Sequence, residues 1–565
     1  MDTDKIADWL ESLFERIEKD ATTGVFKLGT ISSKERDALK IAIAVLRDPG
    51  YTVANDESSN KTEPSKTETP LVVMPDISRE PATKRPTKPV FLNMRSLEFT
   101  NPENPEVILC LDFGTAMSKA WAMTQDGKIL DLALGRLSGK GVYPVDSSLF
   151  ITQDGIIYFG PQAIDQSFKV GPHRQRFDSP KSYLNIGSQG YIDQHFVDKA
   201  INPTETDISG GDLIRLYLAY LTDLACSALE EKGLSRYTIR RFARPCWEEE
   251  RKRWAEPLQK SLLAQAQILA DTFHGRWLDG IPLNEANEAL AQIRELPLER
   301  HFPEYLIDRG IPEPVAAAAS LMIKDEPQRK LFMVMDVGAG TTDFGLFLMQ
   351  ENPDRGVCSI RIIPGTIQYL QQAGNRVDDY LKKYILEHDA VYLDTNDGRH
   401  IASELQKRIK LYKEELFRNG VLEYTLSNQT RNSIELKDFL KDNLVESFQK
   451  QIEDKFKSIL ENLKPGYWNL LVRDQARQGQ NGRLPVVLTG GGATLPMVER
   501  VAQGRFNVNG KTIICEPKPL APDWVTSNKS LNESLSPQYP QLAVAIGGAN
   551  PLLPDEGQAF EDFAG

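Results

Sequence analysis

FMVMDVGAGTTDFGLFLM, residues 332–349, is the stretch of this 565-residue chain that says most about its structure. An apolar run ends in the turn DVGAGTTD over residues 336–343, and a second apolar run follows it. This pattern predicts a β-hairpin whose turn carries two glycines, two hydroxyls and the carboxylates of Asp336 and Asp343. Glycines let backbone amides approach an anion closely, and carboxylates beside a buried hairpin are unfavourable unless they bind something. We therefore predict a phosphate-binding turn here.

Two further apolar runs end in turns of the same kind. VILCLDFGT, residues 107–115, places Asp112 at a strand end and Gly114 and Thr115 in the turn. LPVVLTGGGATLP, residues 484–496, places three glycines after a strand and before a helix that Pro496 can begin. Each string alone also occurs in ordinary turns or mobile loops, so the inference depends on the three together. Together they predict a site for phosphates and for a flat ring or ribose. The ring or ribose would contact the backbone of Gly490, Gly491 and Gly492.

Several classes of function are excluded or disfavoured by what the chain lacks. It has no G-x-x-x-x-G-K-[ST] P-loop and no G-x-G-x-x-G dinucleotide motif. Its five cysteines and six histidines are scattered without metal-binding spacing, so we expect no protein-ligated transition metal. The net charge of −12 disfavours nucleic acid and anionic membrane as partners. Without a signal pattern or a membrane-length apolar run, we expect a soluble, cytoplasmic protein.

The chain is long enough for several domains, and its composition changes along its length. Residues 1–49 predict a helical module, with an apolar stripe formed by Ile6, Trp9, Leu10, Leu13, Phe14 and Ile17. Residues 50–105 are rich in Pro, Ser, Thr, Lys and Glu and predict a flexible linker. The helical module is then either a tethered docking or oligomerisation module or a structural cap.

From residue 106 to about 552, apolar strand-like runs alternate with helical segments, which predicts an α/β fold. Long polar helices dominate residues 399–463, separated by the strand-like VLEYTL and SIEL. Extra helical sequence lies between about 258 and 312, as either a surface insertion or a partner site. An acidic tail follows over residues 553–565.

In this order and strand context, the three glycine turns resemble the phosphate-1, phosphate-2 and adenosine motifs of the superfamily of actin, sugar kinases and heat-shock chaperones. The closest resemblance is to the ATPase domain of DnaK-type seventy-kilodalton heat-shock proteins. GIPEPVAAAAS, residues 310–320, is similar to that family's connecting helix, with Glu313 and Pro314 in the matching places. RFARPCWEEERKRW and QLAVAIGGA are similar to its strand-then-helix segment and its closing helix. The resemblance covers about residues 106–552.

The resemblance implies a two-lobed, actin-like fold of duplicated ribonuclease-H-like lobes that close over ATP or ADP. Lobe I would span about 106–330, lobe II about 331–520, and the closing helix about 537–552. Asp112 and Asp336 would orient the waters around Mg²⁺. The phosphates would contact Thr115 and the backbone amides of Gly114, Gly338 and Gly340.

The resemblance also implies roles in hydrolysis and in base binding. Glu313 and Asp343 would position the attacking water, Thr341 would lie beside the γ-phosphate, and Lys181 in FDSPKSYL would contact phosphate. Towards the base, the matching residues are Gly374 and Lys413. From its own surroundings in the sequence, Lys413 can equally belong to a solvated helix face.

The chain departs from the heat-shock pattern at several positions. Ala116 and Met117 replace a hydroxyl and an aromatic residue, Ala339 replaces the middle glycine of the second turn, and Thr494 stands where the chaperones have an adenine-contacting arginine. We therefore expect ATP to bind and to be hydrolysed slowly. After the closing helix only residues 551–565 follow in this sequence, so we expect no peptide-binding domain.

These expectations describe a nucleotide-dependent switch or divergent chaperone that acts on a protein partner. The partner would bind the N-terminal module or the helical insertion. Two alternatives come from the same superfamily, an actin-like filament protein controlled by ATP and a small-molecule kinase. The kinase would need a catalytic aspartate in a substrate cleft, and the sequence does not identify one.

Overall fold

A computed structural model describes residues 89–185, 190–296, 303–323, 330–352, 357–477 and 483–554, together with two short strands near the N-terminus. The chain divides into two compact units, Met1–Pro81 and Ala82–Gly565.

In the first unit, the strands β1 (Ile17–Lys19) and β2 (Phe26–Leu28) pair antiparallel, with Ile17 opposite Leu28. The sequence predicted a helix with Ile17 on its apolar stripe, and at this residue the prediction is wrong. The rest of the expected helical module lies outside the described residues.

The second unit contains two large sheets, and the first is built around the strand that ends at Asp112. Its order is β12-β10-β3-β4-β5, with β6 paired to β4. β3 runs antiparallel to β4 and parallel to β10, and β10 runs parallel to β12. The strands are β3 (Val107–Asp112), β4 (Met117–Thr124), β5 (Ile129–Leu130), β6 (Val145–Asp146), β10 (Arg240–Arg244) and β12 (Ile307–Pro312).

The second large sheet repeats the pairing of the first. Its order is β15-β14-β13-β19-β21-β20, with β16 paired to β14. β13 runs antiparallel to β14 and parallel to β19, and β19 runs parallel to β21. The predicted hairpin around residues 336–343 is therefore confirmed. The strands are β13 (Lys330–Val337), β14 (Thr342–Asn352), β15 (Val357–Ile362), β16 (Gln368–Leu370), β19 (Leu484–Thr489), β20 (Arg505–Val508) and β21 (Lys511–Pro517).

Each large sheet has its own hydrophobic core. Leu109 and Leu111 of β3 pack with α7, α8 and α9 in the first core, and Met333 and Met335 of β13 pack with α11, α12 and α14 in the second. The predicted α/β class is therefore confirmed. The helices are α7 (Gly210–Glu230), α8 (Glu249–Thr272), α9 (Leu283–Glu295), α11 (Gly374–His388), α12 (Asn396–Asn419) and α14 (Asn443–Glu461).

Smaller elements complete the two cores. The first half carries a sheet in the order β11-β8-β7-β9, and the second carries the predicted VLEYTL and SIEL strands as an antiparallel hairpin, β17 with β18. Their bounds, with those of the short helices, are β7 (Ser148–Ile151), β8 (Ile156–Phe159), β9 (Phe177–Asp178), β11 (Ile281–Pro282), β17 (Val421–Thr425), β18 (Arg431–Glu435), α3 (Leu134–Leu137), α4 (Gly160–Phe168), α5 (Ser182–Asn185), α6 (Tyr191–Gln194), α13 (Leu436–Phe439), α15 (Pro465–Arg477), α16 (Pro496–Ala502), α17 (Asp523–Thr526) and α18 (Lys529–Ser534).

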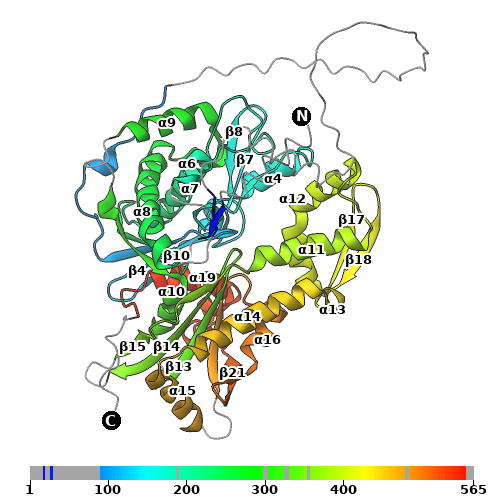
Figure 1. The fold of residues 1–565 in the computed structure, drawn as a ribbon. Coiled ribbons are helices and arrows are strands. Elements are labelled where there is room, and N and C mark those ends of the chain that lie inside the picture. The colour runs from blue at the N-terminus through cyan, green and yellow to red at the C-terminus, as the bar shows by residue number, and fades with distance from the viewer. Residues whose placement is uncertain are drawn as a thin grey trace. The chain divides into compact units, whose positions relative to one another are not determined.

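Two helices connect the sheets, α10 (Glu313–Ala319) and α19 (Tyr539–Gly548), which lie side by side in the centre of Figure 1. One side of α19 packs on Cys110 and Trp121 of the first sheet, while Val544 joins α10 in a cluster with Phe332 of the second. The helices approach so closely that a Cβ added at Gly547 would lie 1.7 Å from the carbonyl oxygen of Ala316. Glycine at this position is therefore required for the crossing.

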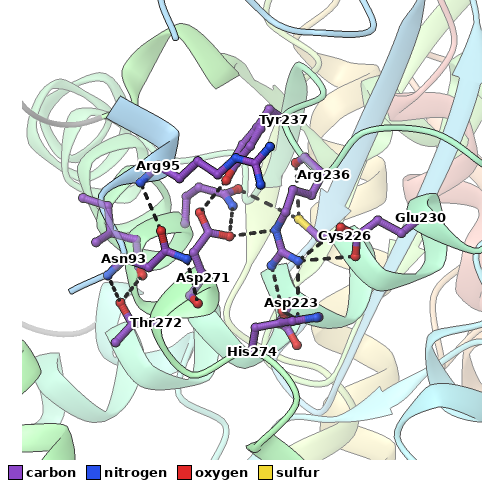
Figure 2. Close-up of polar contacts among 12 residues, drawn as sticks. Asn93, Arg95, Asp223, Cys226, Glu230, Arg236, Tyr237, Asp271, Thr272 and His274 are labelled. Atoms are coloured by element: carbon purple, nitrogen blue, oxygen red, sulfur yellow. Dashed lines mark hydrogen bonds and ion pairs between the residues drawn. The ribbon is translucent and has the colours of Figure 1, made fainter. Parts of the chain in front are cut away.

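The segment from residue 89 onwards is packed rather than extended. Val90 is buried in the first core, the amide of Asn93 donates to Thr272 Oγ1 at 3.0 Å, and the Phe99 ring lies 5.0 Å from that of Tyr237. Figure 2 shows Asn93 and its neighbours beside the buried ion pairs of Arg236. The predicted linker end at residue 105 is therefore wrong, because regularly spaced apolar residues hold this segment on the core.

The extra helical sequence expected between about 258 and 312 is also part of the first core. α9 buries Leu283, Ala286 and Leu290 there. Among the described residues, no helix has both the length and the apolar character needed to cross a bilayer.

Candidate functional site

The three glycine turns lie at the carboxyl ends of neighbouring strands of the two large sheets. Asp112 is the last residue of β3, and Thr489 is the last residue of β19. Asp336, one residue before the end of β13, lies directly across the ladder from Thr489 and accepts a hydrogen bond from its hydroxyl at 2.7 Å. Loops at the carboxyl ends of parallel strands are the usual position for ligands in α/β proteins.

The first and second turns meet face to face. A Cβ added at Gly340 would lie 2.8 Å from Thr115 Oγ1, so no larger residue fits there without moving the threonine. The turn around Gly340 is closed by a hydrogen bond from the Gly338 amide to the Thr341 carbonyl at 3.0 Å. One short loop from each sheet therefore presents its backbone and hydroxyls to the same space.

The third turn completes this arrangement. The Gly492 amide donates to the Val337 carbonyl at 2.8 Å, and the Gly490 amide donates to the Pro540 carbonyl at 2.7 Å. These bonds attach the triple-glycine turn both to the second turn and to the start of α19. The three turns and the crossing helix thus form one connected frame.

A cavity of about 960 Å³, part of it open to solvent, lies between these turns. Every residue that we predicted for the site lines it except Asp343. The lining residues are Asp112, Gly114, Thr115, Ala116, Met117, Lys119, Lys181, Glu313, Asp336, Gly338, Ala339, Gly340, Thr341, Gly374, Lys410, Lys413, Glu414, Gly490, Gly491, Gly492, Leu495, Gln541 and Val544.

Buried charges concentrate at the inner end of the cavity. Lys181, from the segment between β9 and α5, forms a buried ion pair with Glu313 at the start of α10. Lys119 Nζ lies 3.2 Å from Asp112 Oδ2. The acidic groups outnumber these two ammonium groups, since the carboxylates at this end are Asp112, Glu313, Asp336 and Asp343.

This excess of negative charge affects the protonation of the site. Burial raises the pKa of Glu313 to about 8; Lys181 opposes this rise, and the neighbouring aspartates add to it. Burial also raises the pKa of Asp336 to about 7, while the Thr489 hydroxyl opposes that rise. For Lys181, burial acts to lower the pKa, but the carboxylates around it outweigh burial and raise it. The site therefore favours the addition of positive charge.

Asp343 lies directly behind this inner end. It is fully buried, sits opposite Asp336 in the β13–β14 ladder, and accepts a hydrogen bond from the Cys246 amide at 2.9 Å through Oδ1. Its other oxygen, Oδ2, has no hydrogen-bond partner among the described residues. A buried carboxylate oxygen without a partner is unfavourable unless water or a ligand reaches it.

Gly374 and Lys413 line the cavity beside the second turn. The Gly374 amide donates to the Gly338 carbonyl at 3.1 Å, which attaches the start of α11 to the second turn. Lys413 Nζ donates to the Gly374 carbonyl at 3.1 Å and pairs with Asp378 at 2.8 Å. Lys413 therefore does not lie on a solvated helix face.

Sequence reasoning missed one charged residue at the centre of the site, Lys119. A signal for it was present, because Asp112 and Lys119 are seven residues apart, as are Asp336 and Asp343. Had the first turn been interpreted as a hairpin like the second, Lys119 would have been placed opposite Asp112, where the structure has it.

No protein-family model matches this chain, and no curated protein matches it either. Within the described ranges, no group of three or more His, Cys, Asp or Glu side chains is placed to hold a metal ion.

Proposed function

We propose that this protein binds ATP with Mg²⁺ in the cavity between the three glycine turns and hydrolyses it slowly. One observation carries the proposal: a glycine hairpin from each of two similarly built sheets meets at a single cavity whose inner end holds an excess of buried carboxylates. Backbone amides suit phosphate groups, while the carboxylates suit a hydrated divalent cation.

The phosphates fit between the first two turns, where the backbone of Gly114, Gly338 and Gly340 faces the cavity. Thr115 and Thr341 add hydroxyl donors. The adenosine would lie against the bare backbone of Gly490–Gly492, and Gly374 and Lys413 also line this cavity. Ala116 stands where the resembled family has a hydroxyl, so a polar contact to phosphate is absent and we expect hydrolysis to be slow.

The chemistry of the inner end fits Mg²⁺. Asp112 and Asp336 would accept hydrogen bonds from waters of its hydration shell, because Mg²⁺ prefers oxygen ligands and keeps several of its waters. The ion would neutralise charge on the phosphates. It would also relieve the excess of negative charge that adds to the effect of burial in raising the pKa values of Glu313 and Asp336.

Hydrolysis then depends on positioning. Lys181, held by Glu313, presents its ammonium group to the terminal phosphate. Glu313 and Asp343 orient the attacking water, for which Asp343 Oδ2 is an acceptor that no described residue occupies. Attack of this water on the γ-phosphorus would release ADP and phosphate, and a transition state of this kind gains mainly from positioning and charge.

The repeated sheets and the crossing of α10 with α19 support a two-lobed fold of the actin and heat-shock ATPase type, with this crossing as its hinge. Nucleotide bound between the lobes would favour their closure, because both lobes contact it. We propose that a protein partner binds the open and closed forms differently, so that the protein acts as a nucleotide-dependent switch or divergent chaperone. Affinity purification with and without ATP tests this step, and a partner set unaffected by nucleotide would contradict it.

Asp336→Ala tests the assignment of the site. We expect it to abolish Mg²⁺-dependent ATP hydrolysis by the purified protein, measured as phosphate release. Asp165→Ala, at an exposed position on α4, is the matched control and should retain the wild-type rate. An unchanged rate in Asp336→Ala would remove this loop from the proposed mechanism.

A further inference from the structure

Lys119 places a largely enclosed ammonium group at the wall of the cavity. Its side chain is 12% exposed, and Nζ lies 3.2 Å from Asp112 Oδ2. A Cβ added at Gly114 would lie 3.4 Å from the same nitrogen, so the charge sits over the backbone of the first turn. Burial raises the pKa of Asp336, and Lys119 opposes that rise, which places it within electrostatic range of both carboxylates.

The repeated topology identifies Lys119 as the counterpart of Asp343. In the β3–β4 hairpin Asp112 is paired with Lys119, and in the β13–β14 hairpin Asp336 is paired with Asp343. Each hairpin therefore has an aspartate at the end of its first strand and a charged residue directly across from it. One hairpin carries an ammonium group where the other carries a carboxylate.

Resting on the function proposed above, we infer that Lys119 changes partner when nucleotide binds. In the empty cavity it neutralises Asp112. When a hydrated Mg²⁺ takes Asp112, the ammonium group becomes available to the phosphate chain at the first turn, as a second phosphate-binding lysine beside Lys181.

The geometry supports this exchange. Lysine is a compact charge on a flexible stem, so Nζ can leave Asp112 by side-chain rotation alone. Lys181 is paired with Glu313, which the metal would leave in place. Lys119 is paired with Asp112, which the metal would bind, so Lys119 is the ammonium group that would be released beside the first turn. Lys119 and Mg²⁺ therefore compete for Asp112, whereas Lys119 and the phosphates attract each other.

This arrangement predicts effects of opposite sign for Lys119→Met. Calorimetry with Mg²⁺ alone should show tighter metal binding, by several-fold, because the competitor for Asp112 is gone. Calorimetry with ADP at saturating Mg²⁺ should show nucleotide binding weakened by about tenfold or more, because a charge-assisted contact to phosphate is lost. Lys119→Arg, which keeps the charge, should restore much of the nucleotide affinity.

Lys140→Met, at an exposed lysine, is the matched control and should change neither affinity. If Lys119→Met does not fold, as judged by circular dichroism and its thermal midpoint, Lys119→Gln replaces it with the same expectations. An unchanged affinity for ADP, or a loss of both affinities together, would overturn the inference while leaving the proposed function intact. If the wild-type protein binds no nucleotide with Mg²⁺, the proposed function itself fails.

Discussion

The buried pair of Lys181 and Glu313 shows how individual residues at this site constrain one another. Both side chains are enclosed, and further carboxylates surround them. A buried ion pair contributes little net stability, but removal of one partner leaves an uncompensated charge. The pair is therefore best understood as a device that holds an ammonium group inside the cavity.

Removing Lys181 while keeping Glu313 should destabilise the folded protein. Above pH 8, where Glu313 is ionised, we expect Lys181→Met to lower the free energy of unfolding by about 3 kcal/mol, because the Glu313 carboxylate then loses its counter-charge. Denaturant unfolding of the nucleotide-free protein measures this. The double variant Lys181→Met/Glu313→Gln should recover most of the loss, and a double variant as unstable as the single one would contradict this explanation.

The raised pKa of Glu313 also predicts a pH dependence of stability. Burial holds this pKa at about 8 in the folded protein, above its ordinary value of 4.5. The folded state therefore binds more protons than the unfolded state between these values, and stability falls as pH rises from about 4.5 to 8. The thermal midpoint of the EDTA-treated protein should decrease over this range. Glu313→Gln should show a shallower decrease, and identical slopes would argue against a titrating Glu313.

Residue by residue, the sequence predicted most of the cavity lining but not its charge balance. Glycine turns after strands are local patterns, so Gly114, Gly338 and Gly490 could be found by inspection. Lys119 could not be found this way. Its position opposite Asp112 follows from the register of the β3–β4 hairpin, and we predicted no hairpin at the first turn.

At the scale of elements, the crossing of α10 with α19 positions both ends of the site. Glu313 begins α10, while Gln541 and Val544 of α19 line the cavity. The crossing is close because Gly547 offers no side chain to the backbone of Ala316. A separation of the helices would therefore move the inner carboxylates relative to the glycine turns.

Gly547→Ala tests this crossing. An added methyl group would overlap the Ala316 backbone, so we expect the free energy of unfolding to fall by about 1–3 kcal/mol, the usual effect of overpacking. Gly466→Ala is the matched control, since a Cβ there meets no atom within 4 Å. The control should be neutral or slightly stabilising, and equal effects in the two variants would show that the crossing is not the cause.

Element types were predicted best where one pattern was long. The polar helices around residues 399–463 and the hairpin of residues 336–343 appear as expected. The prediction failed at Ile17, where a helical spacing of apolar residues includes a residue that pairs in a strand. It also failed for residues 89–105, because their polar composition hid a few apolar anchors such as Val90 and Phe99.

Within the second unit as a whole, the two sheet-based halves also touch between α12 and the end of α4. Lys407 of α12 donates to the carbonyl oxygens of Ser167, Val170 and Gly171 at 3.0, 3.3 and 2.8 Å. These carbonyls lie at and just beyond the end of α4, where lysine is a favourable partner. Lys410 adds a contact to Asp146 at 3.4 Å.

Loss of the Lys407 contacts should loosen the two halves. We expect Lys407→Met to speed release of a fluorescent ATP analogue by about tenfold, since three charge-assisted hydrogen bonds between the halves are lost. Stopped-flow chase with unlabelled ATP measures this rate. Lys383→Met, on the exposed face of α11, is the control, and equal release rates in all three proteins would contradict a closing role for Lys407.

We propose above all that the cavity between the three glycine turns binds ATP with Mg²⁺, and equilibrium binding measures this without depending on catalysis. Isothermal titration calorimetry of the purified full chain with ATP should show saturable binding at one site per chain in the presence of Mg²⁺. Binding should be weakened or lost in Asp336→Ala. Absence of saturable binding by the wild-type protein at millimolar ATP and Mg²⁺ would contradict the account.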